Sequence, residues 1–141
     1  MDELLAMLRD KGYKITPQRR AVITALLAGG QFSTAQQILE FVRQTNPDIS
    51  LDTVYRNIGL LVDLGIVHEI HTKNRDGHLF EIVASGQHHH HLICTECGNT
   101  QCMSACPINV ELLELAEREE FQITGHLFEV YGKCKKCQKK C

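Results

Sequence analysis

Cys94-Thr-Glu-Cys97 and Cys134-Lys-Lys-Cys137 are two Cys-x-x-Cys segments in this 141-residue chain, in which all seven cysteines lie after residue 93. A tetrahedral Zn²⁺ site takes four thiolates at about 2.3 Å, and each such segment supplies two of them from one short turn. In a reducing compartment, paired segments of this kind hold a metal more often than they form disulfides. These four cysteines therefore predict a structural zinc site that supports the carboxy-terminal part of the fold.

Composition separates this part of the chain from what precedes it. A small polar stretch, residues 84–87, lies between a cysteine-free half and a half rich in cysteine and histidine. We therefore predict two domains, residues 1–84 and 85–141. The net charge of −2 favours no partner, and neither a long apolar run nor a secretory signal is present. We expect a cytoplasmic protein that makes no contact with a membrane.

The first domain shows helical spacing of apolar residues in four consecutive segments. Thr16 with Pro17, Ser33 or Thr34, and Ser50 are expected to cap the second, third and fourth of these helices. Residues 66–72 and 78–83 then alternate around a turn signal at 74–77, which predicts a β-hairpin. The expected core positions include Leu4, Met7, Leu8, Val22, Ile23, Leu26, Leu27, Ile38, Leu39, Val42, Val54, Ile58 and Leu61. Helices followed by a two-stranded wing predict a winged helix.

In a winged helix the last helix enters the DNA major groove, where base edges carry a distinctive pattern of donors and acceptors. The outward residues expected on the fourth helix are Asp52, Thr53, Tyr55, Arg56 and Asn57. Basic residues that could neutralise phosphates gather around the start of the second helix, namely Lys11, Lys14, Arg19 and Arg20. A solvated polar face would show the same residues, so pattern alone leaves DNA recognition and an ordinary surface as equal alternatives.

The second domain begins with four consecutive histidines, His88-His-His-His91, directly before the first Cys-x-x-Cys segment. Residues 109–119 show a helical pattern with Val110, Leu113 and Leu115 or Ala116 available for burial, and residues 121–131 alternate like a strand. So small a module buries little apolar surface by itself, and zinc and dimerisation are the expected supports. We therefore predict an α+β protein, with a winged-helix domain followed by a small α/β dimerisation domain that contains a four-cysteine zinc site.

Four sequence segments, in this order and at this spacing, resemble the ferric uptake regulator (Fur) family of bacterial metal-dependent repressors. They are Gly12-Tyr-Lys-Ile-Thr-Pro-Gln-Arg19, Ser50-Leu-Asp-Thr-Val-Tyr-Arg56, Leu64-Gly-Ile-Val67 and His88-His-His-His-Leu-Ile-Cys-Thr-Glu-Cys-Gly98. The resemblance implies a homodimeric transcriptional repressor that binds an inverted-repeat operator in double-stranded DNA when a regulatory divalent metal is bound. It implies neither an enzyme nor a small-molecule substrate.

The resemblance also implies roles for single residues. The DNA-contacting set would be Lys14, Arg19, Thr53, Tyr55 and Arg56, with Lys14 in a minor groove. The structural zinc ligands would be Cys94, Cys97, Cys134 and Cys137; the regulatory site would contain Glu81, His89 and His91; a second site would contain His88, His90 and His126. The alternating use of histidines has a physical basis, because successive side chains of an extended strand point to opposite faces.

The chain departs from the iron-sensing pattern of the family at three places. Gln31-Phe32 stands where many members carry a sensing His, Cys102 stands in place of Glu or Asp, and Asn109 stands in place of a second-site Glu, with Glu111 as the nearest substitute. We assign Cys102 to the regulatory site and Glu111 to the second site. A thiolate in place of a carboxylate favours Zn²⁺ over Fe²⁺ or Mn²⁺. The regulatory metal is thus expected to be iron or zinc, with Cys102 favouring zinc, and manganese stays open.

Other readings of the cysteines and histidines remain. His68, His71 and His78 are expected to be ordinary residues of the wing, with His71 or His78 as candidates to replace the missing sensing His. Cys102-Met-Ser-Ala-Cys106-Pro107 echoes part of an iron–sulfur ligand motif, so a redox or peroxide sensor based on cysteine or iron–sulfur chemistry is the alternative function.

Overall fold

The computed structural model of the chain describes residues 1–72, 77–83 and 90–139. It contains two compact units, Met1–Gln87 and His88–Cys141, which are described separately below. Three features named from the sequence lie outside the described residues in whole or in part: most of the turn signal at 74–77, the polar stretch at 84–87, and the pair His88 and His89.

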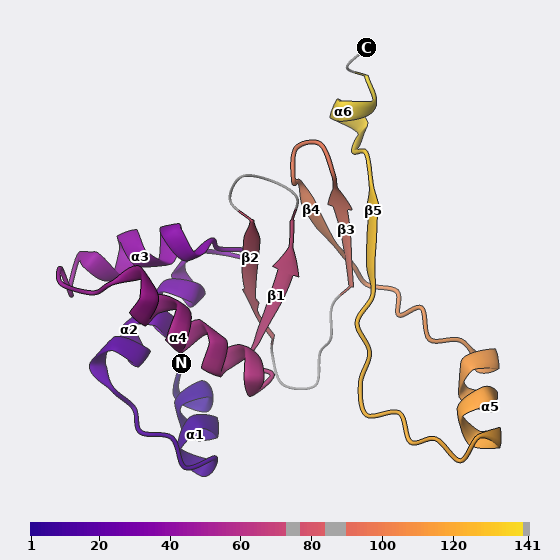
Figure 1. Cartoon of the computed structure of the whole chain (residues 1–141), viewed down its shortest axis with the longest axis horizontal. Helices are drawn as coiled ribbons and strands as arrows, with labels where there is room; N and C mark the ends of the chain where they lie inside the picture. The colour runs from indigo at the N-terminus through magenta and orange to yellow at the C-terminus, as the bar shows by residue number, and fades with distance from the viewer. Residues whose placement is uncertain (73–76, 84–89, 140–141) are drawn as a thin grey trace. The chain divides into compact units, whose positions relative to one another are not determined.

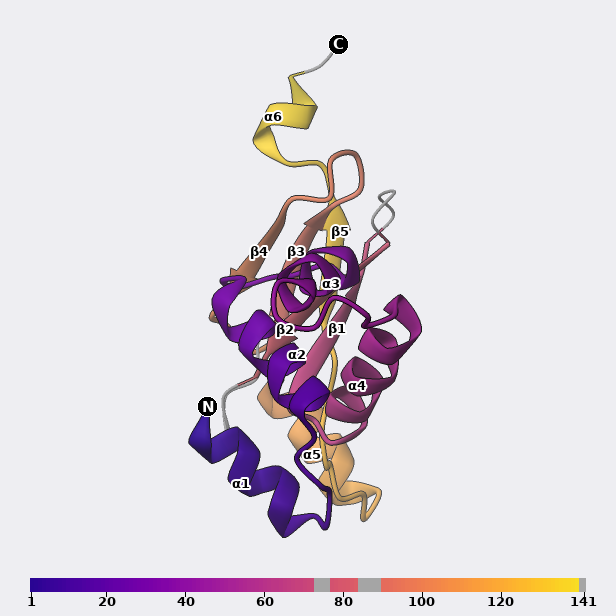
Figure 2. The same ribbon diagram turned by 90° about the vertical axis from the view of Figure 1, so that its left-hand side faces the viewer.

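The first unit is made of helices followed by a hairpin, as the sequence predicts (Figure 1). Its strands pair antiparallel, from Val67 opposite Ile82 to His71 opposite His78. Figure 2 shows α2, α3 and α4 in front of this hairpin. The elements in chain order are α1 (Asp2–Asp10), α2 (Pro17–Ala28), α3 (Ala35–Arg43), α4 (Leu51–Asp63), β1 (Val67–His71) and β2 (His78–Ile82).

Side-chain caps begin three of these helices where the sequence predicts them. The Thr16 side chain accepts a hydrogen bond from the Arg19 backbone N–H, and the Ser50 side chain accepts one from Thr53. Thr34, rather than Ser33, caps α3 and forms a reciprocal capping box with Gln37. Ser33 instead exchanges two backbone hydrogen bonds with Phe80, at 3.0 and 2.8 Å, which fasten the entrance of α3 to β2.

The core of the first unit consists of the inward faces of all four helices and of the hairpin. Most of the predicted core positions are buried, but the Leu27 side chain is 45% exposed and the wholly buried residues of α1 are Leu5 and Leu8. Asn57 is also not an outward residue of α4. It is buried, and its side-chain amide donates to the Thr53 carbonyl oxygen at 2.8 Å, one helical turn earlier.

The second unit contains a three-stranded sheet in the order β4-β3-β5. The elements are β3 (His90–Cys94), β4 (Thr100–Met103), α5 (Val110–Arg118), β5 (Glu129–Gly132) and α6 (Lys135–Gln138). Strand β3 pairs antiparallel with β4 and parallel with β5. The strand predicted over 121–131 is regular only from Glu129 onward. The predicted α+β fold is confirmed.

Helix α5 differs from the expectation that its apolar residues are buried. None of its residues is buried, and Val110 and Leu113 are 68% and 52% exposed. Within its unit the helix lies away from the three strands (Figure 1). The apolar face of the helix is therefore left largely exposed in the described part of this single chain.

Among the residues that the structure describes, no helix is both long enough and apolar enough to cross a membrane.

Candidate metal centres and nucleic-acid interface

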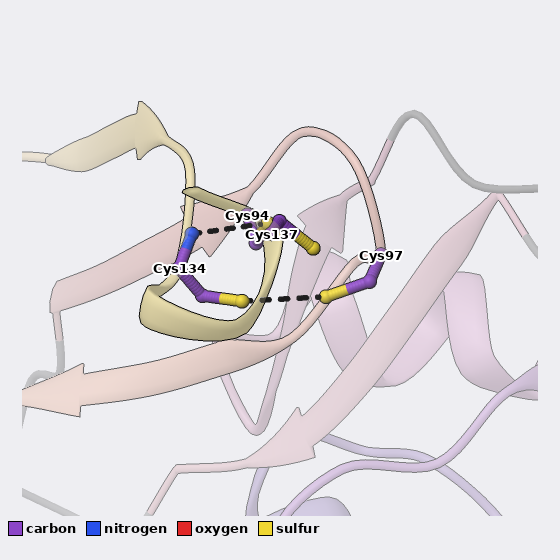
Figure 3. Close-up of side chains that lie close together, drawn as sticks. All are labelled: Cys94, Cys97, Cys134 and Cys137. Atoms are coloured by element: carbon purple, nitrogen blue, oxygen red, sulfur yellow. Dashed lines mark hydrogen bonds between the residues drawn. The ribbon is translucent and has the colours of Figure 1, made fainter. Parts of the chain in front are cut away.

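The two Cys-x-x-Cys segments meet at one end of the three-stranded sheet (Figure 3). Cys94 ends β3 and Cys97 follows in the turn toward β4, whereas Cys134 caps α6 and Cys137 lies within it. Parallel pairing of β3 with β5 sets Cys94 opposite Gly132, so the chain reaches Cys134 two residues later. Segments separated by some forty residues are thereby brought together by sheet register.

The geometry of the four cysteines fits a zinc ion. Their sulfur atoms all lie within 4.8 Å of one another, and the sulfurs of Cys97 and Cys134 are 3.7 Å apart. An ion at about 2.3 Å from four tetrahedral thiolates would separate the sulfurs by about 3.8 Å. The backbone N–H of Cys134 also points at the Cys94 sulfur, at 3.3 Å, which orients this ligand (Figure 3).

Hydrogen bonds give the cysteine thiols of this cluster different pKa values. Donation from the backbone of Cys134, followed by that of Cys97, lowers the pKa of Cys94 to about 6. The backbone of Cys137 likewise lowers the pKa of Cys134. A hydrogen bond with Cys97, followed by burial, raises the pKa of Cys137 to about 12. The metal-free cluster thus holds negative charge at Cys94 and keeps a proton at Cys137.

This division predicts the proton balance of zinc loading. At pH 7.5 the first equivalent of Zn²⁺ should release fewer than four protons, because Cys94, with a pKa of about 6, is already largely ionised. Below pH 6 this thiol binds its proton again, so the release should rise and zinc affinity should fall. Calorimetric titration of metal-free protein in two buffers of different ionisation enthalpy measures the count. Release of four protons at pH 7.5 would contradict the assignment.

A second group of potential ligands lies elsewhere in the same unit. The Nε2 atoms of His90 and His126 are 3.2 Å apart, and the Cys106 sulfur lies 3.3 Å from Nε2 of His126. The three ligand atoms lie within 4.8 Å of one another. His90 is buried, and its ring also meets Phe128 edge-on at 5.9 Å between centroids.

Cys106, and not Glu111, is the third member of this group among the described residues. Asn109 caps α5 by accepting from the Leu112 backbone N–H at 3.0 Å, which fixes Glu111 in the first turn of the helix, where it is exposed. Glu111 therefore stays a prediction from the sequence, and Cys106 is a further candidate ligand that the structure adds. Sequence alone does not show where the segment before the helix turns back, so it gave no sign that Cys106 lies beside the histidines.

The predicted regulatory residues occur as cross-strand pairs within each unit. In the second unit, His91 is opposite Cys102 in the antiparallel pair β3–β4, as expected if residues 99–102 return beside the histidines. In the first unit, Glu81 is opposite His68. Both Glu81 and His91 are buried. His89, the remaining predicted ligand, lies outside the described residues.

His68 is a candidate that sequence reasoning passed over. The predicted turn at 74–77 did not indicate this pair, because it centres the hairpin one residue later than the observed register, in which the numbers of paired residues add to 149, as 68 and 81 do. A buried carboxylate with an imidazole directly opposite is a common arrangement for metal binding and for hydrogen bonding alike.

The predicted recognition helix exposes the residues expected to meet DNA. The Tyr55 side chain is 47% exposed, and Arg56 projects into solvent, where it forms a 2.7 Å ion pair with Asp52. Thr53 is half-buried and bonded to Ser50 through its hydroxyl group at 2.9 Å. Lys14 is exposed in the segment before α2, and the Arg19 guanidinium donates to its carbonyl oxygen.

A winged helix joined to a unit with thiolate and imidazole clusters defines a metal-dependent DNA-binding regulator. The chain belongs to the ferric uptake regulator family, whose model matches residues 10–131. The resemblance inferred from the sequence is thereby confirmed, and the protein is a metal-responsive transcriptional regulator.

Relatives match nearly the whole chain. The peroxide-responsive repressor PerR of Staphylococcus aureus is 35% identical over 141 residues, which cover 99% of this chain and 93% of the relative. The Helicobacter pylori ferric uptake regulator, described with three functional metal-binding sites, has a TM-score of 0.76 at 25% identity and covers 99% and 91% of the two chains. The Vibrio cholerae ferric uptake regulator has a TM-score of 0.67 at 32% identity, over 90% and 96%.

Proposed function

We propose that this chain is a cytoplasmic, homodimeric repressor that binds an inverted-repeat operator when Zn²⁺ occupies a regulatory site containing Cys102. The observation that carries the proposal is the pairing of His91 with Cys102 across β3 and β4. Directly opposed residues of antiparallel strands have Cβ atoms about 4.5–5.5 Å apart on one face of the sheet. An imidazole and a thiolate so placed can bind one metal ion.

The other proposed ligands come from the hairpin of the first unit. Glu81 is retained, His89 is retained from the sequence, and His68 is added because it is opposite Glu81. Together with His91 and Cys102, these residues offer nitrogen, oxygen and sulfur donors, of which the thiolate favours zinc over iron or manganese.

The cluster of Cys94, Cys97, Cys134 and Cys137 is proposed as the structural zinc site, and His90, Cys106 and His126 as a further metal site. Support comes from converging donor atoms in both places. His88 and Glu111, predicted for the same site as His90, remain proposals from the sequence. Three kinds of site in one chain would parallel the three functional metal-binding sites of the Helicobacter pylori regulator.

Homodimerisation is supported by the apolar surface of the second unit. Besides Val110 and Leu113 on α5, the side chains of Phe121 and Leu127 are 68% and 64% exposed. A hollow beside the helix is lined by Leu112, Leu115, Ala116, Glu119, Phe121 and Ile123. Obligate dimer interfaces resemble a divided hydrophobic core, and a second copy would bury this surface.

Peroxide sensing is the second candidate function, and the 35% identity to the Staphylococcus aureus repressor favours it. An exposed Cys102 thiol beside a metal would give such a sensor an oxidisable group. An iron–sulfur cluster is less well supported, because Cys106 lies with His90 and His126 whereas Cys94 and Cys97 lie with the other Cys-x-x-Cys segment.

Exchanging the thiolate tests the proposal. Cys102→Asp should raise the zinc concentration needed for half-maximal operator binding by at least about tenfold, the lower end of what even outer-shell changes at metal sites produce. The same variant should respond to Fe²⁺ or Mn²⁺ at lower concentrations than the parent, because a hard carboxylate suits those ions. Fluorescence anisotropy with a labelled operator, under anaerobic conditions and with buffered metals, gives both curves.

As a control, the zinc content of Cys102→Asp is measured after dialysis against a chelator. It should remain at one ion per chain, because the variant leaves the four-cysteine cluster unchanged. A metal profile equal to that of the parent would remove Cys102 from the regulatory site. Loss of operator binding by the iron-loaded parent on brief exposure to peroxide, without the same loss in the zinc-loaded parent, would favour the peroxide-sensing function.

A further inference from the structure

The wing carries a cluster of potential metal ligands that is separate from the sites described above. Glu69 and His71 are two residues apart on β1 and therefore share one face of the hairpin. His78 begins β2 and is directly opposite His71 in the last pair of the register. The hairpin thus places one carboxylate and two imidazoles on the same side, at the end where β1 leads into the turn.

The three side chains converge, and His78 contacts both of the others. Nδ1 of His78 lies 2.9 Å from Oε1 of Glu69, and the rings of His71 and His78 meet edge to face with centroids 4.7 Å apart. One ligand atom from each residue lies within 4.8 Å of the other two. The side chains of His78 and Glu69 are 45% and 34% exposed, so solvent reaches the cluster.

An ordinary surface ion pair explains this arrangement only in part. An exposed contact between His78 and Glu69 contributes only about 0–1 kcal/mol. It also gives no role to His71, whose ring lies against that of His78. A divalent ion would give all three side chains a role, with the two imidazoles as nitrogen ligands and the carboxylate as an oxygen ligand that supplies compensating charge.

We propose that Glu69, His71 and His78 form a zinc site on the wing. Two histidines and one glutamate are an established ligand set for zinc with an open coordination position, which water would fill at this exposed place. The ion would join the two strands beside the turn and add two positive charges to the wing. Antiparallel pairing holds two of the three ligands in place before the metal arrives, which lowers the cost of ordering them.

The test uses the full-length protein with its cysteine site loaded, in the presence of Zn²⁺ alone. Long-range ¹H–¹⁵N spectra of the imidazoles, assigned by the His71→Ala and His78→Ala variants, should show both rings changing together as zinc is added at pH 7.5. Equilibrium dialysis at a free zinc concentration that saturates the parent should find one ion fewer per chain in His78→Ala. Glu69→Gln should weaken binding by at least about tenfold.

Glu40→Gln, a carboxylate-to-amide change on α3 outside the cluster, serves as the matched control and should bind zinc like the parent. The proposal is overturned if the His71 and His78 signals of the parent do not respond to zinc, or if His78→Ala binds as many ions as the parent. If an alanine variant fails to fold, equilibrium dialysis of Glu69→Gln against Glu40→Gln still decides the question, and equal zinc binding by these two variants would overturn the proposal. Failure here would leave the Cys102 site intact, because that site is read from operator binding by a variant in another unit.

Discussion

Cys134→Ser is expected to abolish chelator-resistant zinc, from one ion per chain to none, and to dissociate the proposed homodimer. Structural zinc binding in small peptides contributes about 10–16 kcal/mol at neutral pH, and a zinc ion held by these four sulfurs would link the end of β3 to the start of α6. A unit with so few buried side chains cannot replace that contribution from its core. We expect its thermal transition to fall by more than about 10 °C or to lose cooperativity.

The measurements are metal analysis after dialysis against a chelator, analytical ultracentrifugation and thermal unfolding followed by circular dichroism. Cys141→Ser provides the control, because it makes the same chemical change outside the four sulfurs and should keep the zinc. A Cys134→Ser protein that remained dimeric and kept one tightly bound zinc ion would show that these sulfurs do not hold the structural metal.

Arg56→Ala should reduce specific operator affinity by roughly 5- to 140-fold, which corresponds to about 1–3 kcal/mol for a lost base contact. The ion pair of Arg56 with Asp52 does not oppose this role. Its two side chains are 79% and 71% exposed and four residues apart, and such helix pairs contribute about 0.3–0.5 kcal/mol. Arg56 can therefore exchange Asp52 for DNA at small cost.

Anisotropy titrations over a range of salt concentrations would separate base reading from charge. Arg56→Ala should lose discrimination between the operator and scrambled DNA. Lys14→Ala should instead weaken binding to both and reduce the salt slope by about one. Arg118→Ala, which removes an exposed arginine from the other unit, should behave like the parent. Equal operator affinity for Arg56→Ala and the parent would assign recognition to another element.

The helices and the hairpin of the first unit could be predicted because they depend on residues close together in the sequence. Thr16 and Ser50 cap helices because a hydroxyl group satisfies a free backbone N–H within three residues, and no tertiary information is needed. The hairpin follows from alternation on either side of a turn signal. The exposed face of α4 was less predictable, because Asn57 satisfies its amide on the Thr53 carbonyl and can therefore be buried.

Ligand groups in the second unit depended on tertiary structure. The four-cysteine cluster was predictable because each Cys-x-x-Cys segment already carries half of it. Cys106 was not assigned, because its meeting with His90 and His126 depends on the path of irregular segments on both sides of α5. The exposure of α5 could not be read from its pattern either, since an apolar stripe has the same spacing whether it covers a core or a second copy of the chain.

Strand β3 contributes one residue to each of the three metal sites proposed above for the structural, regulatory and further ions: Cys94, His91 and His90, respectively. Because His90 and His91 point to opposite faces, a substitution on a neighbouring segment changes one metal site and leaves the other with its own histidine. Residue 102 on β4 can thus be changed from a carboxylate to a thiolate side chain without any change in the sequence of β3. During evolution, a single substitution at this position could therefore change the metal preference of one site and leave the ligands of the other metal sites unchanged.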